Sequence, residues 1–78
     1  MTASFGNLSV FLVEPSVAQA KFITAQLKAM DIELVRNFGK GADVLQALNE
    51  NRPDLVISAL YLPDMSGTDL LGAIRRRG

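Results

Sequence analysis

Cysteine and histidine are both missing from the 78 residues of this sequence. Without thiols there are no disulfides and no thiol catalysis, and without imidazole the usual zinc ligand sets and serine–histidine catalysis cannot be built. Net charge is also missing, because eight acidic residues offset eight basic ones. A neutral chain gives no electrostatic case for binding nucleic acid. These absences exclude several common classes of enzyme before any motif is considered.

Long hydrophobic runs are missing as well. No stretch approaches the roughly 20 apolar residues of a membrane span, and the start of the chain lacks the basic segment of a signal peptide. We therefore expect a cytoplasmic protein without a membrane partner. The length predicts one small domain, residues 1–78, whose core contributes only about 3–5 kcal/mol beyond the entropy cost of ordering the chain.

Short apolar runs alternate with amphipathic segments along the chain. Three runs rich in aliphatic residues predict strands at 8–13, 32–36 and 54–59. Three segments with helical spacing of apolar residues predict helices at 16–30, 40–51 and 66–77. Ser16 with Gln19, and Ser66 with Asp69, form capping patterns at two of the helix starts. The alternation predicts an α/β fold with a parallel sheet and helices on both faces.

In such a sheet, ligands bind beyond the carboxyl ends of the strands. Glu14 and Pro15 follow the first predicted strand, and Ala59 ends the third. The turn after the first strand contains no glycine, so neither a dinucleotide fingerprint nor a P-loop is present. We therefore expect no nucleotide cofactor at this edge.

Four segments together resemble the receiver domain of response regulators in two-component signalling. They are the strand with an acidic end (VFLVEPS), the Asn-Phe-Gly turn, the RPDLVI entry to the third strand and the LPDMSG turn. The resemblance covers about residues 8 to 77 and implies a flavodoxin-like sheet in strand order 2-1-3. A full receiver has two further strand–helix units, so the resemblance implies a truncated receiver.

The resemblance also implies a role for three positions. The acidic pair of a receiver corresponds to Glu14 and Pro15, and its phosphoacceptor aspartate corresponds to Ala59. A methyl group cannot attack phosphorus, and Mg²⁺ at phosphoryl sites is held by carboxylates, phosphate oxygens and water. Glu14 alone is therefore a poor magnesium site, and we expect no metal, no cofactor and no enzymatic activity.

Two other side chains near the acceptor position are candidates for chemistry. Ser58 precedes Ala59, and strand alternation turns it to the opposite face, which favours a packing role. Asp64 lies in the Leu-Pro-Asp turn, where aspartate commonly accepts backbone hydrogen bonds. The alternative is a non-standard site in which Glu14 and Asp64 hold a metal and Ser58 or Asp64 accepts the phosphoryl group.

The third predicted strand lies at an edge of the sheet. Between Leu55 and Leu62 it has no charge and no internal proline, so it is a template for pairing with another chain. We expect a degenerate receiver-like module that acts by protein–protein contact with a signalling partner, and a homodimer through this edge. The alternative is the N-terminal part of a longer response regulator whose output lies elsewhere. Tyr61 fits an exposed edge, and the Arg75–Arg77 run fits a helix C-terminus without nucleic acid.

Overall fold

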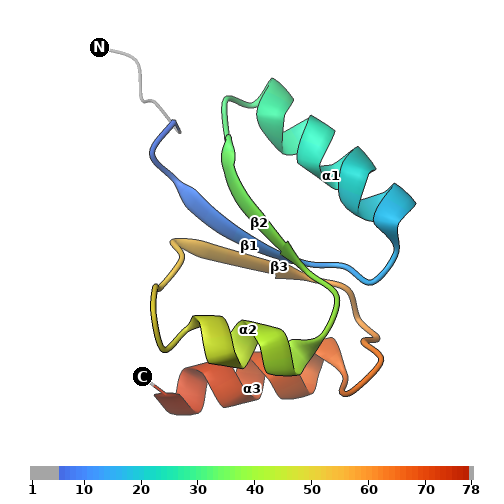
Figure 1. Ribbon diagram of the computed structural model, residues 1–78, viewed down its shortest axis with the longest axis vertical. Helices are drawn as coiled ribbons and strands as arrows, with labels where there is room; N and C mark the ends of the chain where they lie inside the picture. Colours follow the sequence, from blue (N-terminus) through green and yellow to red (C-terminus); the bar gives the residue numbers. More distant parts are fainter. Residues whose placement is uncertain (1–5, 78) are drawn as a thin grey trace.

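The computed structural model describes residues 6–77, so the outermost ends of the predicted domain 1–78 lie outside the described residues. Six elements alternate between strand and helix: β1 (Ser9–Val13), α1 (Val17–Ala29), β2 (Leu34–Phe38), α2 (Gly41–Ala47), β3 (Leu55–Ser58) and α3 (Gly67–Arg77). β1 pairs in parallel with β2 on one side and with β3 on the other (Figure 1). The predicted α/β fold and the strand order 2-1-3 are confirmed.

The helices cover the two faces of the sheet unequally. α1 lies on one face, where Leu27 packs in a cluster with Val10 of β1, and α2 and α3 lie together on the other (Figure 1). Side chains alternate between faces along a strand, which places Phe11 on the α2–α3 face. The buried residues of the larger cluster come from both helices and two strands: Phe11, Val13, Phe38, Val44, Ala47 and Leu70. Most of the core therefore lies between the sheet and the α2–α3 pair.

The second strand begins later than predicted because the end of α1 takes its first residue. The prediction was 32–36, whereas β2 spans Leu34–Phe38. Ile32 N–H donates to the Leu27 carbonyl at 2.9 Å, and both side chains belong to one buried cluster. This bond and this contact are those of a Schellman motif, which terminates helices. Ile32 therefore closes the helix instead of opening the strand.

Asp31 takes the left-handed position of that motif, with a φ of 65°, and its N–H donates to the Lys28 carbonyl at 2.9 Å. A left-handed backbone costs a residue with a Cβ about 1 kcal/mol, a strain that glycine avoids. We expect Asp31→Gly to raise the free energy of unfolding by up to about 1 kcal/mol, measured by urea denaturation. Asp31→Ala keeps the Cβ, so equal stabilisation by both variants would contradict this explanation.

α2 is shorter than the predicted range 40–51 and ends at Ala47. After this residue, the N–H groups of Asn49 and Glu50 donate to carbonyls three residues back, which is the tighter winding common at helix ends. Asparagine favours such ends because its side chain competes for backbone bonds. The other four elements differ from their predicted ranges by no more than one residue at either end.

The serine half of each predicted capping pattern is confirmed, whereas the Ser16 N–H bonds to Glu14 Oε2 instead of Gln19. Gln19 N–H donates to Ser16 Oγ at 3.3 Å, and Asp69 N–H donates to Ser66 Oγ at 3.0 Å. Each bond satisfies a backbone amide that has no partner within its helix. Among residues 6–77, no helix has the length and apolar character needed to cross a membrane.

Candidate functional site

The carboxyl ends of β1 and β3 lie side by side at one edge of the sheet. Val13 of β1 is opposite Ser58 of β3, and Ala59 N–H extends this pairing by donating to the Val13 carbonyl at 2.9 Å. Glu14 and Ala59 therefore follow directly from neighbouring positions on two adjacent strands. This is the edge at which open parallel sheets bind ligands, and it brings together two of the predicted site residues.

Glu14 closes the turn between β1 and α1. Its N–H donates to the Phe38 carbonyl of β2 at 2.9 Å, and its Oε2 accepts the N–H of Ser16 at 2.9 Å. Pro15 lies exposed between these two residues and has no N–H of its own. One oxygen of the single acid at the end of β1 is thus engaged in holding the turn.

The backbone at Ala59 is packed against the first residue of α3. Ser58 Oγ donates to the Ala59 carbonyl at 2.9 Å, and a Cβ built on Gly67 would overlap the same carbonyl oxygen. Gly67 N–H also donates to the Leu60 carbonyl at 2.7 Å. The end of β3 therefore has a fixed path, and the Ser58 hydroxyl bonds to backbone beside it.

Asp64 caps the N-terminus of α2. Its Oδ2 accepts the N–H of Ala42 and its Oδ1 accepts the N–H of Gly41, each at 2.9 Å. Lys40, which precedes the helix, makes no side-chain cap bond. The hydrogen bonds from Ala42 and Gly41 hold the pKa of Asp64 below its ordinary value of 3.8, because they stabilise the carboxylate form. Both oxygens of Asp64 thus join the β3–α3 loop to α2.

The predicted alternative of a metal held by Glu14 and Asp64 gains no support from these contacts. Glu14 bonds within the turn after β1, and Asp64 bonds to α2. Across residues 6–77, no three side chains of the metal-ligating types gather into a group that could hold an ion. The three positions that directly follow β1 and β3 thus hold one acid, a proline and a methyl group: Glu14, Pro15 and Ala59.

We expect Asp64→Ala to lower the thermal midpoint of unfolding, because the amides of Gly41 and Ala42 lose a charged acceptor. Asp64→Asn keeps one acceptor oxygen and should lower it less. A lowered pKa means that the contribution of Asp64 is complete above 3.8 and is lost as the pH falls through the folded-state pKa. Melting curves of wild type and Asp64→Asn should therefore converge in acid.

The control for this prediction is Asp69→Asn. Asp69 is also an acid in the first turn of a helix, but its backbone rather than its side chain takes part in the cap. Its replacement should have a smaller effect at neutral pH. A gap between wild type and Asp64→Asn that persists unchanged below pH 3.8 would contradict the capping role.

Gly67 and Met65 are structural residues of this edge; both lie in the quoted LPDMSG motif and Met65 was expected to pack, but the sequence did not predict their contacts. Gly67 is needed because the Ala59 carbonyl occupies the space of its Cβ, and the side chain of Met65 lies against Gly41 at the start of α2. The one available signal was the Ser-Gly pair directly before an amphipathic segment. Leu60 and Tyr61, by contrast, project from the loop with exposures of 71% and 82%.

A parallel sheet with order 2-1-3 and helices on both faces defines a doubly wound α/β domain, here with an acid after β1 and a Leu-Pro turn after β3. The chain belongs to the response regulator receiver domain family, whose model matches residues 10–78. As a receiver domain, it has a role in signalling. This confirms the family and the fold that the quoted motifs implied.

Three relatives illustrate the similarity. The regulatory protein LuxO of Vibrio cholerae is 32% identical over 85% of this chain, and the transcriptional regulatory protein KdpE of Mycobacterium tuberculosis is 40% identical over 80%. A protein-glutamate methylesterase/protein-glutamine glutaminase of Nocardioides is 36% identical over 92%. This chain spans only 14%, 26% and 20% of these proteins, respectively. No solved structure gave a significant match.

Proposed function

We propose that this receiver domain signals by protein–protein contact without phosphorylation at its acceptor position. The observation that carries the proposal is the methyl group of Ala59 at the end of β3, where the family places a nucleophilic carboxylate. A methyl group offers no lone pair for attack on phosphorus. Pro15 removes the second acid of the neighbouring pair, which leaves Glu14 as a single carboxylate at the end of β1.

The hydrogen bonds of the nearby polar side chains support the same proposal. Ser58 Oγ bonds to the Ala59 carbonyl, both oxygens of Asp64 bond to amides of α2, and one oxygen of Glu14 bonds to the turn. A phosphoryl group on Ser58 or Asp64 would displace a bond that shapes the loop or caps a helix, whereas Glu14 uses only one of its two oxygens in the turn. An unphosphorylated domain keeps all of these bonds and presents one constant surface to a partner.

The direct test is labelling of the full chain by acetyl phosphate with Mg²⁺, detected by intact-mass spectrometry. An intact receiver with an aspartate acceptor serves as the positive control. We expect the control to gain one phosphoryl group and the wild-type chain to gain none. A phosphoryl group on Ser58, Asp64 or Glu14 in the wild type would overturn the proposal and support the non-standard acceptor.

A companion experiment uses the double variant Pro15→Asp with Ala59→Asp, which restores both missing carboxylates. We expect Mg²⁺ binding, measured by titration calorimetry, to appear in the double variant and to be absent or weak in wild type, because hard cations prefer several carboxylate oxygens. The single variant Ala59→Asp is the matched comparison for the contribution of position 15. Equal Mg²⁺ affinity in wild type and in the double variant would contradict the assignment of the acid pocket.

The proposal extends to a homodimer through the edge of β3. β3 pairs with β1 on one side and forms an outer edge of the three-stranded sheet. Leu55 is 43% exposed and Val56 and Ile57 are half-buried, so pairing with a second copy would cover apolar surface and backbone groups together. Light scattering over a concentration series should give the mass of two chains. A mass of one chain at every concentration would overturn this extension alone.

A further inference from the structure

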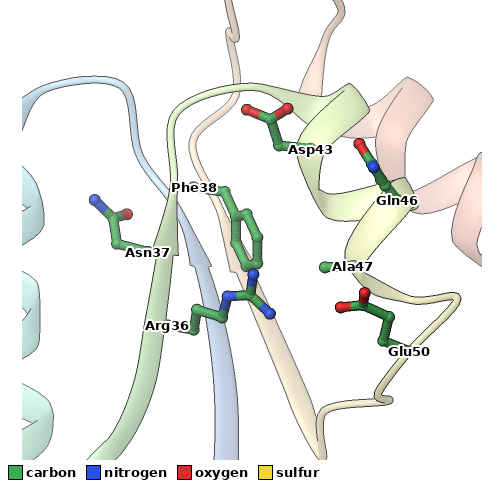
Figure 2. A pocket seen from close by; sticks show the side chains of 7 residues that line it. All are labelled: Arg36, Asn37, Phe38, Asp43, Gln46, Ala47 and Glu50. Atoms are coloured by element: carbon green, nitrogen blue, oxygen red, sulfur yellow. The ribbon is translucent and has the colours of Figure 1, made fainter.

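β2 is the second outer strand of the sheet, on the opposite side from β3. Hollows lie along it on both faces of the sheet, one between β2 and α1 and the other between β2 and residues 43–50. Figure 2 shows Asn37 directed toward α1, while Arg36 and Phe38 point toward α2. A strand placed beside β2 would therefore direct its alternate side chains into two different hollows.

The hollow on the α2 side is polar and acidic on balance. It has a volume of about 430 Å³ and is lined on the helix side by Asp43, Gln46 and Glu50 (Figure 2). Arg36 forms the strand side and is held by a cation–π contact, with its guanidinium carbon 4.9 Å from the centre of the Phe38 ring. Two acids against one base favour a cationic side chain in this hollow.

This hollow continues along β2 beyond the end of α2. A second depression of about 560 Å³ shares Arg36 with the first and includes Leu34, which is 53% exposed. The short α2 leaves this half of the strand uncovered. The α2 side of β2 is therefore open at Leu34 and Arg36, whereas Phe38 is buried in the core.

The hollow on the α1 side has the opposite character. It also has a volume of about 430 Å³, and its apolar lining residues are Val17, Ala20 and Ala25. Lys21 and Lys28 line the same hollow two helical turns apart. An aliphatic side chain fits the apolar part of this lining, and an acidic one fits the two ammonium groups.

Backbone groups complete the site. The Phe38 carbonyl accepts from Glu14 N–H and so faces β1, and backbone groups of successive residues in a parallel strand point to opposite neighbours. The N–H and carbonyl of Asn37 are therefore directed to the free edge. They can hydrogen-bond an added strand, which supplies affinity, while the hollows supply selectivity.

We propose that the free edge of β2 binds an extended peptide segment of a partner protein as an additional strand. The segment carries aliphatic and acidic side chains on the face toward α1 and basic side chains on the face toward α2. A second copy of this chain fits poorly, because β3 (LVIS) has neither an acid for Lys21 and Lys28 nor a base for the α2-side hollow, and β2 (LVRNF) has no acid. The proposal goes beyond the proposed function, since it holds whether or not the chain is phosphorylated.

Two labelled synthetic peptides of the same composition test the pattern. The first alternates valine or glutamate with lysine or threonine over eight residues, and the second is a shuffled version without alternation. Fluorescence anisotropy with the full chain should show about tenfold tighter binding of the alternating peptide, as expected for one or two additional hydrogen bonds and ion pairs. NMR of the labelled chain should place the largest amide shift at Asn37, because the Val35 N–H already donates to the Glu33 carbonyl at 3.0 Å.

Two variants test the backbone hydrogen bond and the side-chain charges separately. Asn37→Pro removes the outward N–H at an edge position, where proline is tolerated. Lys21→Glu with Lys28→Glu reverses the charge of two residues that line the α1-side hollow. Each should weaken binding of the alternating peptide about tenfold. Arg75→Glu with Arg76→Glu is the matched control, because it makes the same change in charge on α3, outside both hollows.

Four results would overturn the proposal. The first two are equal binding of the two peptides and no binding of either. The others are amide shifts centred on Leu55–Ser58 of β3 and equal losses of affinity from the Lys21/Lys28 and Arg75/Arg76 reversals. The lysine reversal decides the question even where Asn37→Pro fails to fold, since both lysines are exposed on α1. Phosphoryl labelling of the wild type would contradict the proposed function and leave this result unaffected.

Discussion

Replacing Gly67 with alanine should reduce the free energy of unfolding by about 1–3 kcal/mol, the usual cost of forcing an atom into filled space. The added methyl group would overlap the Ala59 carbonyl oxygen and approach Ser58 Oγ to 3.2 Å. The first of these is a backbone atom, so the strand end or the whole of α3 must move. Urea denaturation followed by circular dichroism measures the loss.

Two other glycines serve as controls for this prediction. At Gly72, in the same helix, a Cβ would meet only the tip of Arg76 at 3.4 Å, so Gly72→Ala should stabilise by about 0.5–1 kcal/mol through helix propensity. At Gly41 the obstacle is the flexible side chain of Met65, so Gly41→Ala should cost less than Gly67→Ala. Equal losses at positions 67 and 72 would show that the close approach to Ala59 is not the cause.

Truncating Leu70 to alanine should lower the free energy of unfolding by a large part of the domain's total stability. Leu70 has 0% exposure and belongs to the main cluster with Val13, Phe38 and Val44. A leucine-to-alanine change in a well-packed core costs about 2–5 kcal/mol, which is comparable to the whole stability of a domain this small, about 3–5 kcal/mol. Leu70→Ala should therefore lose the cooperative thermal transition.

The neighbouring leucine provides the control. Leu71 is 44% exposed in the same helix, so Leu71→Ala removes the same atoms from a site that water already reaches. Its cost should be well below that of Leu70→Ala, at about 1 kcal/mol or less. Similar melting curves for the two variants would contradict the placement of Leu70 at the centre of the core.

Periodicity predicted the elements well where local signals act alone. The runs around Val10 and Ile57 and the caps at Ser16 and Ser66 are encoded by neighbours in sequence, and the structure confirms them. The prediction that Ile32 begins a strand was wrong, because an apolar residue suits both a strand and the hydrophobic contact of a helix cap. Only the burial of Ile32 against Leu27 decides between these two outcomes.

The sequence predicted where the candidate site lies, but it did not predict the hydrogen bonds and packing contacts within the site. Strand-end logic and the family resemblance together located Glu14 and Ala59 at one edge, and backbone pairing places them on adjacent strands. The cap formed by Asp64 joins residues 22 and 23 positions apart, and no local pattern carries information over that separation. The need for glycine at position 67 is likewise a property of tertiary packing.

Because β1 lies at the centre of the sheet, hydrogen exchange of its amides can measure the stability of each variant of this domain. β1 is paired on both sides within the described sheet, and residues Val10–Val13 are at most 3% exposed. Amide protons in such a strand exchange with solvent chiefly when the whole domain opens, whereas those at outer edges exchange through smaller openings. The deuterium uptake of this one strand should therefore report the global unfolding equilibrium, and the uptake of Asn37 should report occupancy of the β2 edge.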